Sequence, residues 1–114
     1  MTVTFAALQD LPERKMLPGV YLRILPGDAV MFSIVRFDPR ATVPTHQHPH
    51  EQMGFVLEGE LDLWVADERR HLGRWDLYTI PSNVPHGAET QDATCVVVDV
   101  FHPLRDEYVK LFQE

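Results

Sequence analysis

The segment PTHQHPHEQ (residues 44–52) sets His46 and His48 two positions apart. On an extended strand, side chains two positions apart point to the same side, with their roots about 7 Å from each other. Pro44 and Pro49 disfavour a helical conformation at the residues that precede them, so we expect this segment to be extended. Two imidazoles placed in this way can bind one metal ion.

A third histidine is available farther along the chain. His86 lies in IPSNVPHG (80–87), where Pro85 has a fixed φ and biases Val84 toward an extended conformation. Imidazole is a common ligand of divalent transition metals. The three histidines therefore predict a metal site. The alternative is a fold that has lost its metal, or histidines that simply face solvent.

Several short segments predict β-strands separated by turns. They are rich in β-branched, aromatic or alternating residues and cover 21–24, 29–37, 54–57, 60–65, 76–80 and 94–101. The segments LPGD, FDPR, LEGE, VADERR and PSNVP predict turns between them, with a tight hairpin at Glu58-Gly59. Many short strands at this spacing indicate a sandwich or a barrel.

The two ends of the chain differ from this strand-rich middle. Leu104, Tyr108, Leu111 and Phe112 recur at helical spacing and predict a terminal helix that packs one apolar face. We expect the first fifteen residues to form an edge strand or a covering turn.

Composition indicates one compact domain over residues 1–114. The chain is 45% hydrophobic, and its net charge of −7 argues against a nucleic acid or an anionic membrane as partner. No leader or membrane segment stands out, so we expect a soluble, cytoplasmic protein. The single cysteine, Cys95, cannot form an internal disulfide, and its apolar surroundings predict a buried packing residue.

The histidine segment resembles the first motif of the cupin superfamily, small β-barrels that hold a metal near the barrel axis. In that motif HxH is followed by a Glu and then by a Gly. Here His46 and His48 are followed by Gln52 at the Glu position and by Gly59, whose spacing selects Gln52 over Glu51. The resemblance covers nearly the whole chain. It implies an all-β, cupin-type double-stranded β-helix (jelly-roll barrel) with a short C-terminal helix.

The second cupin motif, which ends PxGxxH, resembles Pro81, Asn83 and His86 in this chain, with Asn at the glycine position. Asn also tolerates a left-handed backbone conformation. Other positions depart from the pattern: Arg40 and Trp75 replace turn glycines, and Thr90 replaces the closing Asn. Standard turn geometry is not expected at these positions.

The resemblance implies a metal site formed by His46, His48, Gln52 and His86. Without an anionic ligand the ion keeps its full charge, which favours binding of an oxyanion or carboxylate and Lewis-acid chemistry over oxygen chemistry. The expected cofactor is one divalent transition metal ion, and nickel, manganese, iron, zinc, copper and cobalt would all fit. The neighbouring His50 and Glu51 are expected in a turn outside the ligand set, with ligation as the alternative.

A narrower resemblance links the chain to pectin-degradation cupins of the KdgF type. The segment DVFHPLRDEY (99–108) follows HPHEQ and NVPHG in the same order as in that family. Its members are understood to open the ring of 4,5-unsaturated monouronates, giving linear 5-keto uronates. The resemblance implies roles at the site for Asp99, Phe101 and Arg105.

The residues themselves leave these three roles open. Alternation along 94–101 puts Asp99 on one face with Val97 and Phe101, so it is either a cavity-facing acid/base or a salt-bridged carboxylate. Arg105 can grip a substrate carboxylate or pair with an acidic neighbour on the surface. Phe101 is expected in the core, as are Trp64 and Trp75, with sugar stacking as the alternative. Arg23 and Arg36 can point into the barrel or outward.

We therefore expect a metal-dependent enzyme that opens and ketonises unsaturated monouronates, and whose partner is a small anionic, sugar-like substrate. Asp99 would move protons between the anomeric hydroxyl and the enol carbon. A metal-dependent dioxygenase of the quercetinase kind is the second hypothesis, and a non-catalytic sugar-binding module is the third. The resemblance also implies a homodimer.

Overall fold

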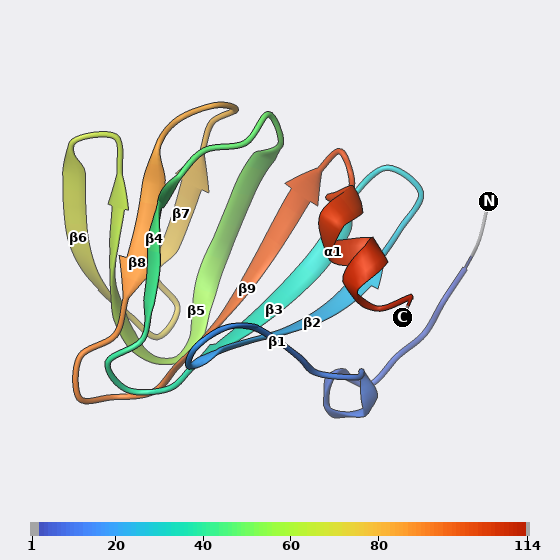
Figure 1. The fold of residues 1–114 in the computed structure, drawn as a ribbon, viewed down its shortest axis with the longest axis horizontal. Coiled ribbons are helices and arrows are strands. Elements are labelled where there is room, and N and C mark those ends of the chain that lie inside the picture. The colour runs from blue at the N-terminus through green and yellow to red at the C-terminus, as the bar shows by residue number, and fades with distance from the viewer. Residues whose placement is uncertain (1–2, 114) are drawn as a thin grey trace.

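A computed structural model describes residues 3–113 and shows one curled antiparallel sheet with a single short α-helix near its C-terminus (Figure 1). The all-β expectation is confirmed. The elements are η1 (Leu8–Asp10), β1 (Arg14–Leu17), β2 (Val20–Pro26), β3 (Met31–Phe37), β4 (Thr42–His46), β5 (Glu51–Val65), β6 (Glu68–Gly73), β7 (Leu77–Ile80), β8 (His86–Glu89), β9 (Cys95–His102) and α1 (Asp106–Leu111).

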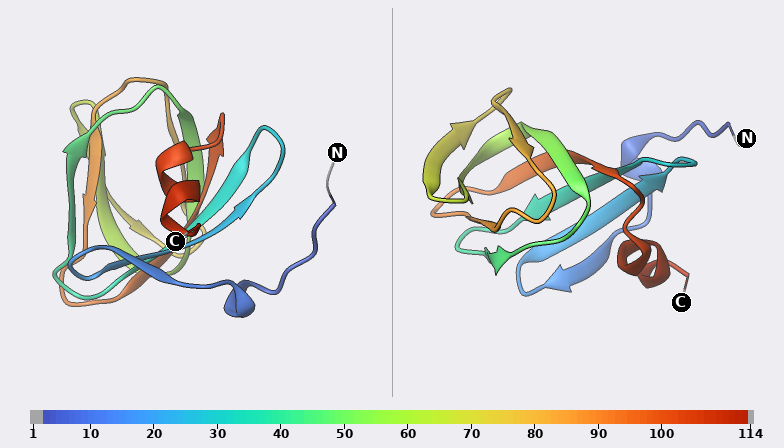
Figure 2. Two further views of the ribbon diagram at one scale, coloured as in Figure 1. Left: turned by 45° about the vertical axis from the view of Figure 1, so that its right-hand side comes forward. Right: turned by 90° about the horizontal axis from the view of Figure 1, so that it is seen from above.

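The long strand β5 joins the two halves of the sheet. Its first half pairs with β7 and β9, and β9 continues the sheet to β3, β2 and β1. Its second half pairs with β6 and β8, and β8 continues to β4. The two halves curl toward each other, and α1 lies at the open side of the curl (Figure 2). This arrangement brings β4, β8 and β9 around one interior.

The predicted hairpin at Glu58-Gly59 is wrong, because β5 runs through both residues as one strand. Gly59 has φ +78°, and the register with β9 shifts between Val56 and Glu58, which marks a β-bulge. A Cβ at Gly59 would overlap the carbonyl oxygen of Thr94, the residue just before β9. The glycine therefore bends the strand from one half of the sheet into the other, where the local sequence suggested a chain reversal.

Three strands have no counterpart among the strand segments predicted from the sequence: β4, β6 and β8. Each is short or rich in polar residues, so its apolar alternation is weak. The segment VADERR, expected as a turn, reverses only at Ala66 and Asp67, and Glu68 already begins β6. The expected extended conformation around the histidines holds at His46, the last residue of β4, but His48 lies beyond the strand.

The residues at the positions of the motif's glycines adopt the left-handed backbone conformation. Arg40, Trp75 and Asn83 have φ of 56°, 72° and 61°. Thr90 is buried, and its Oγ1 donates a 2.6 Å hydrogen bond to the Asp38 carbonyl and accepts one of 3.0 Å from the Ala41 amide. The departures from the motif therefore change the residues at these turns and leave the backbone geometry in place.

The predicted terminal helix is confirmed, and the edge strand expected among the first fifteen residues is found only at its last two positions. The terminal helix forms, and the residues that pack it against the core are Leu104, Tyr108, Val109, Leu111 and Phe112. Of the first fifteen residues, only Arg14 and Lys15 belong to the edge strand β1; residues 3–13 contain the short 3-10 helix η1 and no strand, and residues 1 and 2 lie outside the described part of the chain. Arg23 points outward, where its Nη1 donates to the Leu8 and Leu11 carbonyls at 3.1 and 3.0 Å. Arg36 pairs with Glu13 at 2.9 Å.

The core assignments from the sequence hold for Cys95 and Phe101, whereas Trp64 is only half-buried and lies outside the core cluster. Cys95 is buried, and burial raises the pKa of its thiol to about 12, consistent with a packing role. Trp75 was expected in the core but lies in a turn, is 56% exposed and stacks on Phe55. Within residues 3–113, neither helix has the length or apolar character needed to cross a membrane.

Candidate metal centre and adjoining cavity

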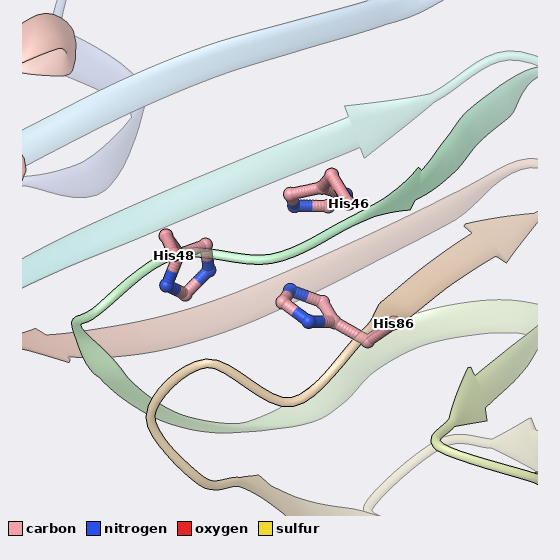
Figure 3. Close-up of side chains that lie close together, drawn as sticks. All are labelled: His46, His48 and His86. Carbon is pink, nitrogen blue, oxygen red and sulfur yellow. The ribbon is translucent and has the colours of Figure 1, made fainter.

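Three histidines from two strands and a loop converge inside the curled sheet (Figure 3). His46 ends β4 and is the register partner of His86, which begins β8. Their ring centroids are 4.3 Å apart, and the His48 ring lies 4.9 Å from that of His86. One ligand atom from each ring lies within 4.8 Å of the other two. The sequence prediction that these three side chains meet is therefore confirmed.

Each imidazole is held by a backbone carbonyl two residues away. The Nδ1 atoms of His46, His48 and His86 lie 2.9, 3.0 and 2.8 Å from the carbonyl oxygens of Pro44, His50 and Val84. A carbonyl only accepts, so each Nδ1 carries the proton and donates it. Each Nε2 is then left with a free lone pair, as metal-ligating histidines require.

The surroundings also keep two of the rings neutral. Burial lowers the pKa of His48 to about 4, and the charges of Arg105 and His86 act in the same direction. Burial likewise lowers the pKa of His86. At neutral pH both rings are therefore uncharged, with the proton on Nδ1 and the Nε2 lone pair free, which is the form that binds a metal ion.

Gln52 lies beside the three histidines, and its contact with His48 is one that a bound cation would stabilise. Its Oε1 lies 3.1 Å from His48 Nε2. Its amide nitrogen faces the other way, because the Gln52 side chain also hydrogen-bonds the Asp99 carboxylate, which can only accept. Two acceptors, Oε1 and Nε2, therefore face each other at hydrogen-bond distance. A cation bound to both removes their repulsion.

A second unsatisfied atom supports the same conclusion. His86 Nε2 is buried and has no hydrogen-bond partner in the described part of the chain. Buried polar atoms are rarely left without a partner. Three imidazole nitrogens and one amide oxygen are the donors that divalent transition metals accept in proteins. The residues present therefore fit such an ion.

His50 and Glu51 lie outside this cluster, and while His50 is in the expected bend, Glu51 is already part of strand β5. Glu51 begins β5 and is exposed, and the cluster of potential ligand atoms does not include His50. The His50 ring packs at 5.3 Å from that of His48, and its carbonyl orients that ring. His50 thus contributes through its backbone.

Asp99 faces the same interior from β9. It is 4% exposed, and its Oδ1 accepts a 2.6 Å hydrogen bond from the Tyr78 hydroxyl. Burial raises the pKa of Asp99 to about 6, against the opposing effects of Tyr78, Gln52 and Arg105. Of the two alternatives left open by the sequence, the cavity-facing carboxylate is the one observed. A carboxyl group that titrates near neutrality can accept and return a proton.

Gly54 makes room for this carboxylate. It lies on β5 between Asp99 of β9 and Tyr78 of β7 in one cross-strand row. A Cβ at this position would overlap Asp99 Oδ1 and would lie 2.8 Å from the Tyr78 hydroxyl. The absence of a side chain lets the tyrosine reach across β5 to the aspartate.

The sequence left two possibilities for Arg105, binding a substrate carboxylate or pairing with an acidic neighbour. The structure shows features of both. It is 8% exposed, and its guanidinium packs 4.0 Å from the centroid of the Tyr108 ring and 5.0 Å from that of Phe101. It also pairs with Glu107, with Nε and Nη2 at 2.8 and 2.7 Å from Oε1. Its partner is largely exposed, so the guanidinium is buried while the carboxylate that neutralises it reaches solvent.

The histidine cluster, Asp99 and Arg105 border one cavity of about 60 Å³. Phe101 is 2% exposed and forms part of its wall, which confirms the packing expectation, while its ring also contacts that of His48 at 5.6 Å. The polar residues that line the cavity are Ser33, His46, Gln52, Tyr78, His86, Asp99, Arg105 and Tyr108. Metal ligands, a titratable carboxylate and a cation thus share one interior.

Sequence reasoning did not identify Tyr78, Gly54 or Glu107 as site residues. Alternation in 76–80 puts Tyr78 on the same face as Ile80, which is buried, so a weak signal existed. The role of Gly54 follows from the pairing of three strands that are distant in the chain. Local sequence carries no sign of such a row.

Comparison with known proteins gives two curated relatives of interest. Over 102 residues the chain is 26% identical to the pectin degradation protein KdgF of Dickeya dadantii, covering 88% of this chain and 93% of that protein. Over 64 residues it is 38% identical to H2HPP isomerase of Bacillus subtilis, but this match covers 54% of the chain and 27% of the isomerase. The chain therefore spans about a quarter of that second relative.

Solved structures agree with the observed fold. The structure of KdgF from Halomonas sp. superposes with a TM-score of 0.88 at 29% identity, covering 94% of this chain and 99% of that one. An RmlC-like cupin from Shewanella frigidimarina gives a TM-score of 0.87 at 25% identity, with 94% and 96% covered. Residues 33–101, which contain all the residues of the candidate metal centre, match the family described as the cupin domain. This chain is a member of the cupin family.

Proposed function

We propose that this protein is a metal-dependent cupin that opens and ketonises 4,5-unsaturated monouronates to linear 5-keto uronates. The observation that carries the proposal is the placement of Asp99, with its raised pKa, between the histidine cluster and Arg105 in one cavity. These groups supply a site for a cation, a proton carrier and a positive charge for a carboxylate. A monouronate needs all three.

The metal would be held by His46, His48, Gln52 and His86. Such an ion supplies Lewis acidity, which stabilises negative charge that develops on substrate oxygen atoms. Since these four ligands are neutral, they leave the charge of the ion undiminished. A strongly positive centre suits an anionic substrate, in a chain whose net charge of −7 otherwise repels it.

Asp99 would carry the proton. As a carboxylate it accepts the proton of the anomeric hydroxyl while the bond between C1 and the ring oxygen breaks, leaving an aldehyde and an enolate. As a carboxylic acid it then returns that proton to C4, and the enolate becomes the 5-keto group. Atoms and charge balance, because the reaction is an isomerisation. A pKa of about 6 suits a group that performs both transfers.

Arg105 would bind the substrate carboxylate. Its guanidinium already holds the carboxylate of Glu107, so the geometry for an acidic group exists there. Glu107 is largely exposed, and a bound uronate would replace it. Phe101 and Tyr108 hold the guanidinium by stacking, which limits its movement during this exchange.

The relatives support the same class of reaction. The matched Dickeya protein is named for pectin degradation, and a uronate is the sugar unit of pectin. The Bacillus relative is named an isomerase, which is the reaction type proposed here. Proton transfer within the substrate also fits the neutral ligand set, which is a less suitable environment for activating oxygen.

The test uses purified protein loaded separately with manganese, nickel, iron or zinc and mixed with unsaturated galacturonate. We expect rapid loss of the absorbance of the conjugated double bond, with a product of unchanged mass. Asp99→Asn is expected to lower the rate at least about 100-fold while substrate binding is retained. A rate no faster than buffer for every metal would sink the proposal.

The same assay separates the alternatives that the sequence left open. A dioxygenase would consume oxygen and add oxygen atoms to the product, which mass spectrometry detects. A sugar-binding module would bind uronate without turnover, and Asp99→Ala would leave that binding intact. Arg105→Lys serves as a charge-matched variant, because lysine keeps the positive charge but cannot form two parallel hydrogen bonds with a carboxylate.

A further inference from the structure

Ser33 interrupts the apolar inner side of β3. Alternation along the strand points Met31, Ser33 and Val35 to the interior, and both neighbours on this side are apolar. Ser33 is 0% exposed, and its Oγ has no hydrogen-bond partner anywhere in residues 3–113. Buried hydroxyl groups are usually hydrogen-bonded, because taking one out of water without compensation costs free energy. The partner of Ser33 therefore comes from outside the chain.

The register of the sheet places Ser33 beside Asp99. The two residues are partners on the adjacent strands β3 and β9, so their side chains leave the sheet on the same side, with Cβ atoms about 5 Å apart. Both line the cavity of about 60 Å³. They are not hydrogen-bonded to each other, because Asp99 Oδ1 lies over Gly54 and accepts from Tyr78. A small group bound between Ser33 and Asp99 would reach both side chains.

The Asp99 carboxylate can accept a hydrogen bond from such a group. It already accepts from the Tyr78 hydroxyl and the Gln52 side chain, while its two oxygens offer about four lone-pair positions. A group bound to a carboxylate must donate, and Ser33 can donate to that same group because its hydroxyl rotates freely. A hydroxyl group or a water molecule donates and accepts at one oxygen. An ether, a carbonyl or a second carboxylate cannot donate to Asp99.

We propose that Ser33 and Asp99 form a subsite for one hydroxyl oxygen, which is a water molecule in the free protein and the anomeric hydroxyl of the bound substrate. The assignment of the substrate group rests on the function proposed above. Ser33 donates to this oxygen, and the oxygen donates to Asp99. Ser33 then stabilises the negative charge that the oxygen acquires when Asp99 takes its proton.

The size of the cavity limits which part of a substrate reaches Ser33. A water needs at least about 10–15 Å³ of such space, so the 60 Å³ cavity accommodates roughly four waters, or one end of a sugar. The rest of a uronate would lie in an adjoining hollow of about 290 Å³, which shares with the cavity Met16, Val43, His46, Arg105 and Tyr108.

Arg105 borders both the cavity and the hollow. In a uronate, the carbon that bears the carboxylate and the anomeric carbon are both bonded to the ring oxygen. A substrate carboxylate bound at Arg105 therefore leaves the anomeric hydroxyl nearby, at the end of the molecule that enters the cavity. This is the end that Ser33 and Asp99 would bind.

Calorimetric binding of two ligands that do not react tests the proposal on the purified protein with its metal bound. Galacturonate carries the anomeric hydroxyl, and its 1-deoxy (1,5-anhydro) analogue lacks it. We expect the wild type to bind galacturonate about 10-fold more tightly than the analogue. Ser33→Ala should reduce this preference to less than about 3-fold. A merely structural serine would instead weaken both ligands equally and leave the preference unchanged.

Ser82→Ala is the matched control. Ser82 is the other serine of the chain and lies exposed in the turn before β8, so its loss should leave the preference unchanged. Circular dichroism checks the fold of each variant. Ser33→Cys, which has a similar volume and only a weak donor, replaces Ser33→Ala if the alanine variant does not fold.

Crystal structures of the ligand-free wild type and of Ser33→Ala provide a second readout that needs no uronate. We expect an ordered water about 2.5–3.0 Å from both Ser33 Oγ and an Asp99 oxygen in the wild type, and its loss or displacement in the variant. No water at this position, or an unchanged ligand preference in Ser33→Ala, overturns the proposal. If neither ligand binds the wild type, the uronate function is contradicted, and the water in the two crystal structures decides whether the subsite exists.

Discussion

The Tyr78 hydroxyl reaches across β5 to donate a 2.6 Å hydrogen bond to Asp99 on β9. The two residues belong to strands that pair with opposite edges of β5, and Gly54 lies between them. Asp99 in turn accepts from the Gln52 amide. One buried carboxylate therefore links a tyrosine, a proposed metal ligand and the cavity, and its properties depend on all three.

Tyr78→Phe should raise the pKa of Asp99 above its present value of about 6, because the hydrogen bond from Tyr78 stabilises the charged carboxylate. The acidic limb of the pH-rate profile should move to higher pH, and the rate at pH 7 should fall several-fold. Steady-state rates on unsaturated galacturonate across pH measure this. Thr79→Val, on the exposed side of the same strand, is the control, and an unmoved acidic limb would contradict the assigned role of Tyr78.

Gly54→Ala should disrupt the site, since the added Cβ overlaps Asp99 Oδ1 and approaches the Tyr78 hydroxyl. Overpacking of this kind typically costs ~1–3 kcal/mol of unfolding free energy. We expect a rate at least about 10-fold lower as the carboxylate is displaced. Gly73→Ala is the matched control because no atom lies within 4 Å of its added Cβ. Chemical denaturation and rate measurements on both variants give the comparison.

Asp99→Asn should stabilise the metal-free protein at pH 7. Burial raises the folded-state pKa of this carboxyl from 3.8 to about 6, so the folded state binds the proton more tightly than the unfolded state. The associated stability is present below pH 4 and is lost as pH rises through 6. Removing the charge should therefore raise the unfolding free energy at pH 7 by up to about 2–3 kcal/mol. Denaturant titrations in the presence of a chelator should show this gain at pH 7 and little of it at pH 4.

The parts of the site that depend on the spacing of residues along one segment could be predicted from the sequence. The spacing of His46 and His48 predicted that they share one side, and the period of two along 94–101 put Asp99 and Phe101 on the same face without deciding that it was the inner one. The Asp99, Gly54 and Tyr78 row depends on the pairing of β9, β5 and β7, which no local pattern encodes. The hairpin predicted at Glu58-Gly59 was wrong for a similar reason. The same dipeptide serves a turn or a bulge, and the neighbouring strand β9 decides between them.

Gln52→Glu should strengthen metal binding and weaken catalysis. A carboxylate ligand adds attraction for a divalent ion, so metal affinity should rise about 10-fold or more. Gln52 lies against Asp99, and two adjacent carboxylates cannot both be charged without a large cost. The amide hydrogen bond to Asp99 would also be lost. Calorimetric metal titration and turnover rates measured on the same sample should move in opposite directions, and tighter metal binding with full activity would contradict this view.

Glu107→Gln should improve substrate binding. The Glu107 carboxylate occupies the guanidinium of Arg105, with Oε1 at 2.8 Å from Nε and 2.7 Å from Nη2, and a uronate must displace it. A neutral amide competes less strongly, so KM should fall about 3–10-fold while kcat changes little, because Phe101 and Tyr108 still hold the guanidinium in place. Asp106→Asn removes the same charge from the neighbouring exposed residue and should leave KM unchanged. A rise in KM for the Glu107 variant would show that this carboxylate positions Arg105 for the substrate and does not compete with it.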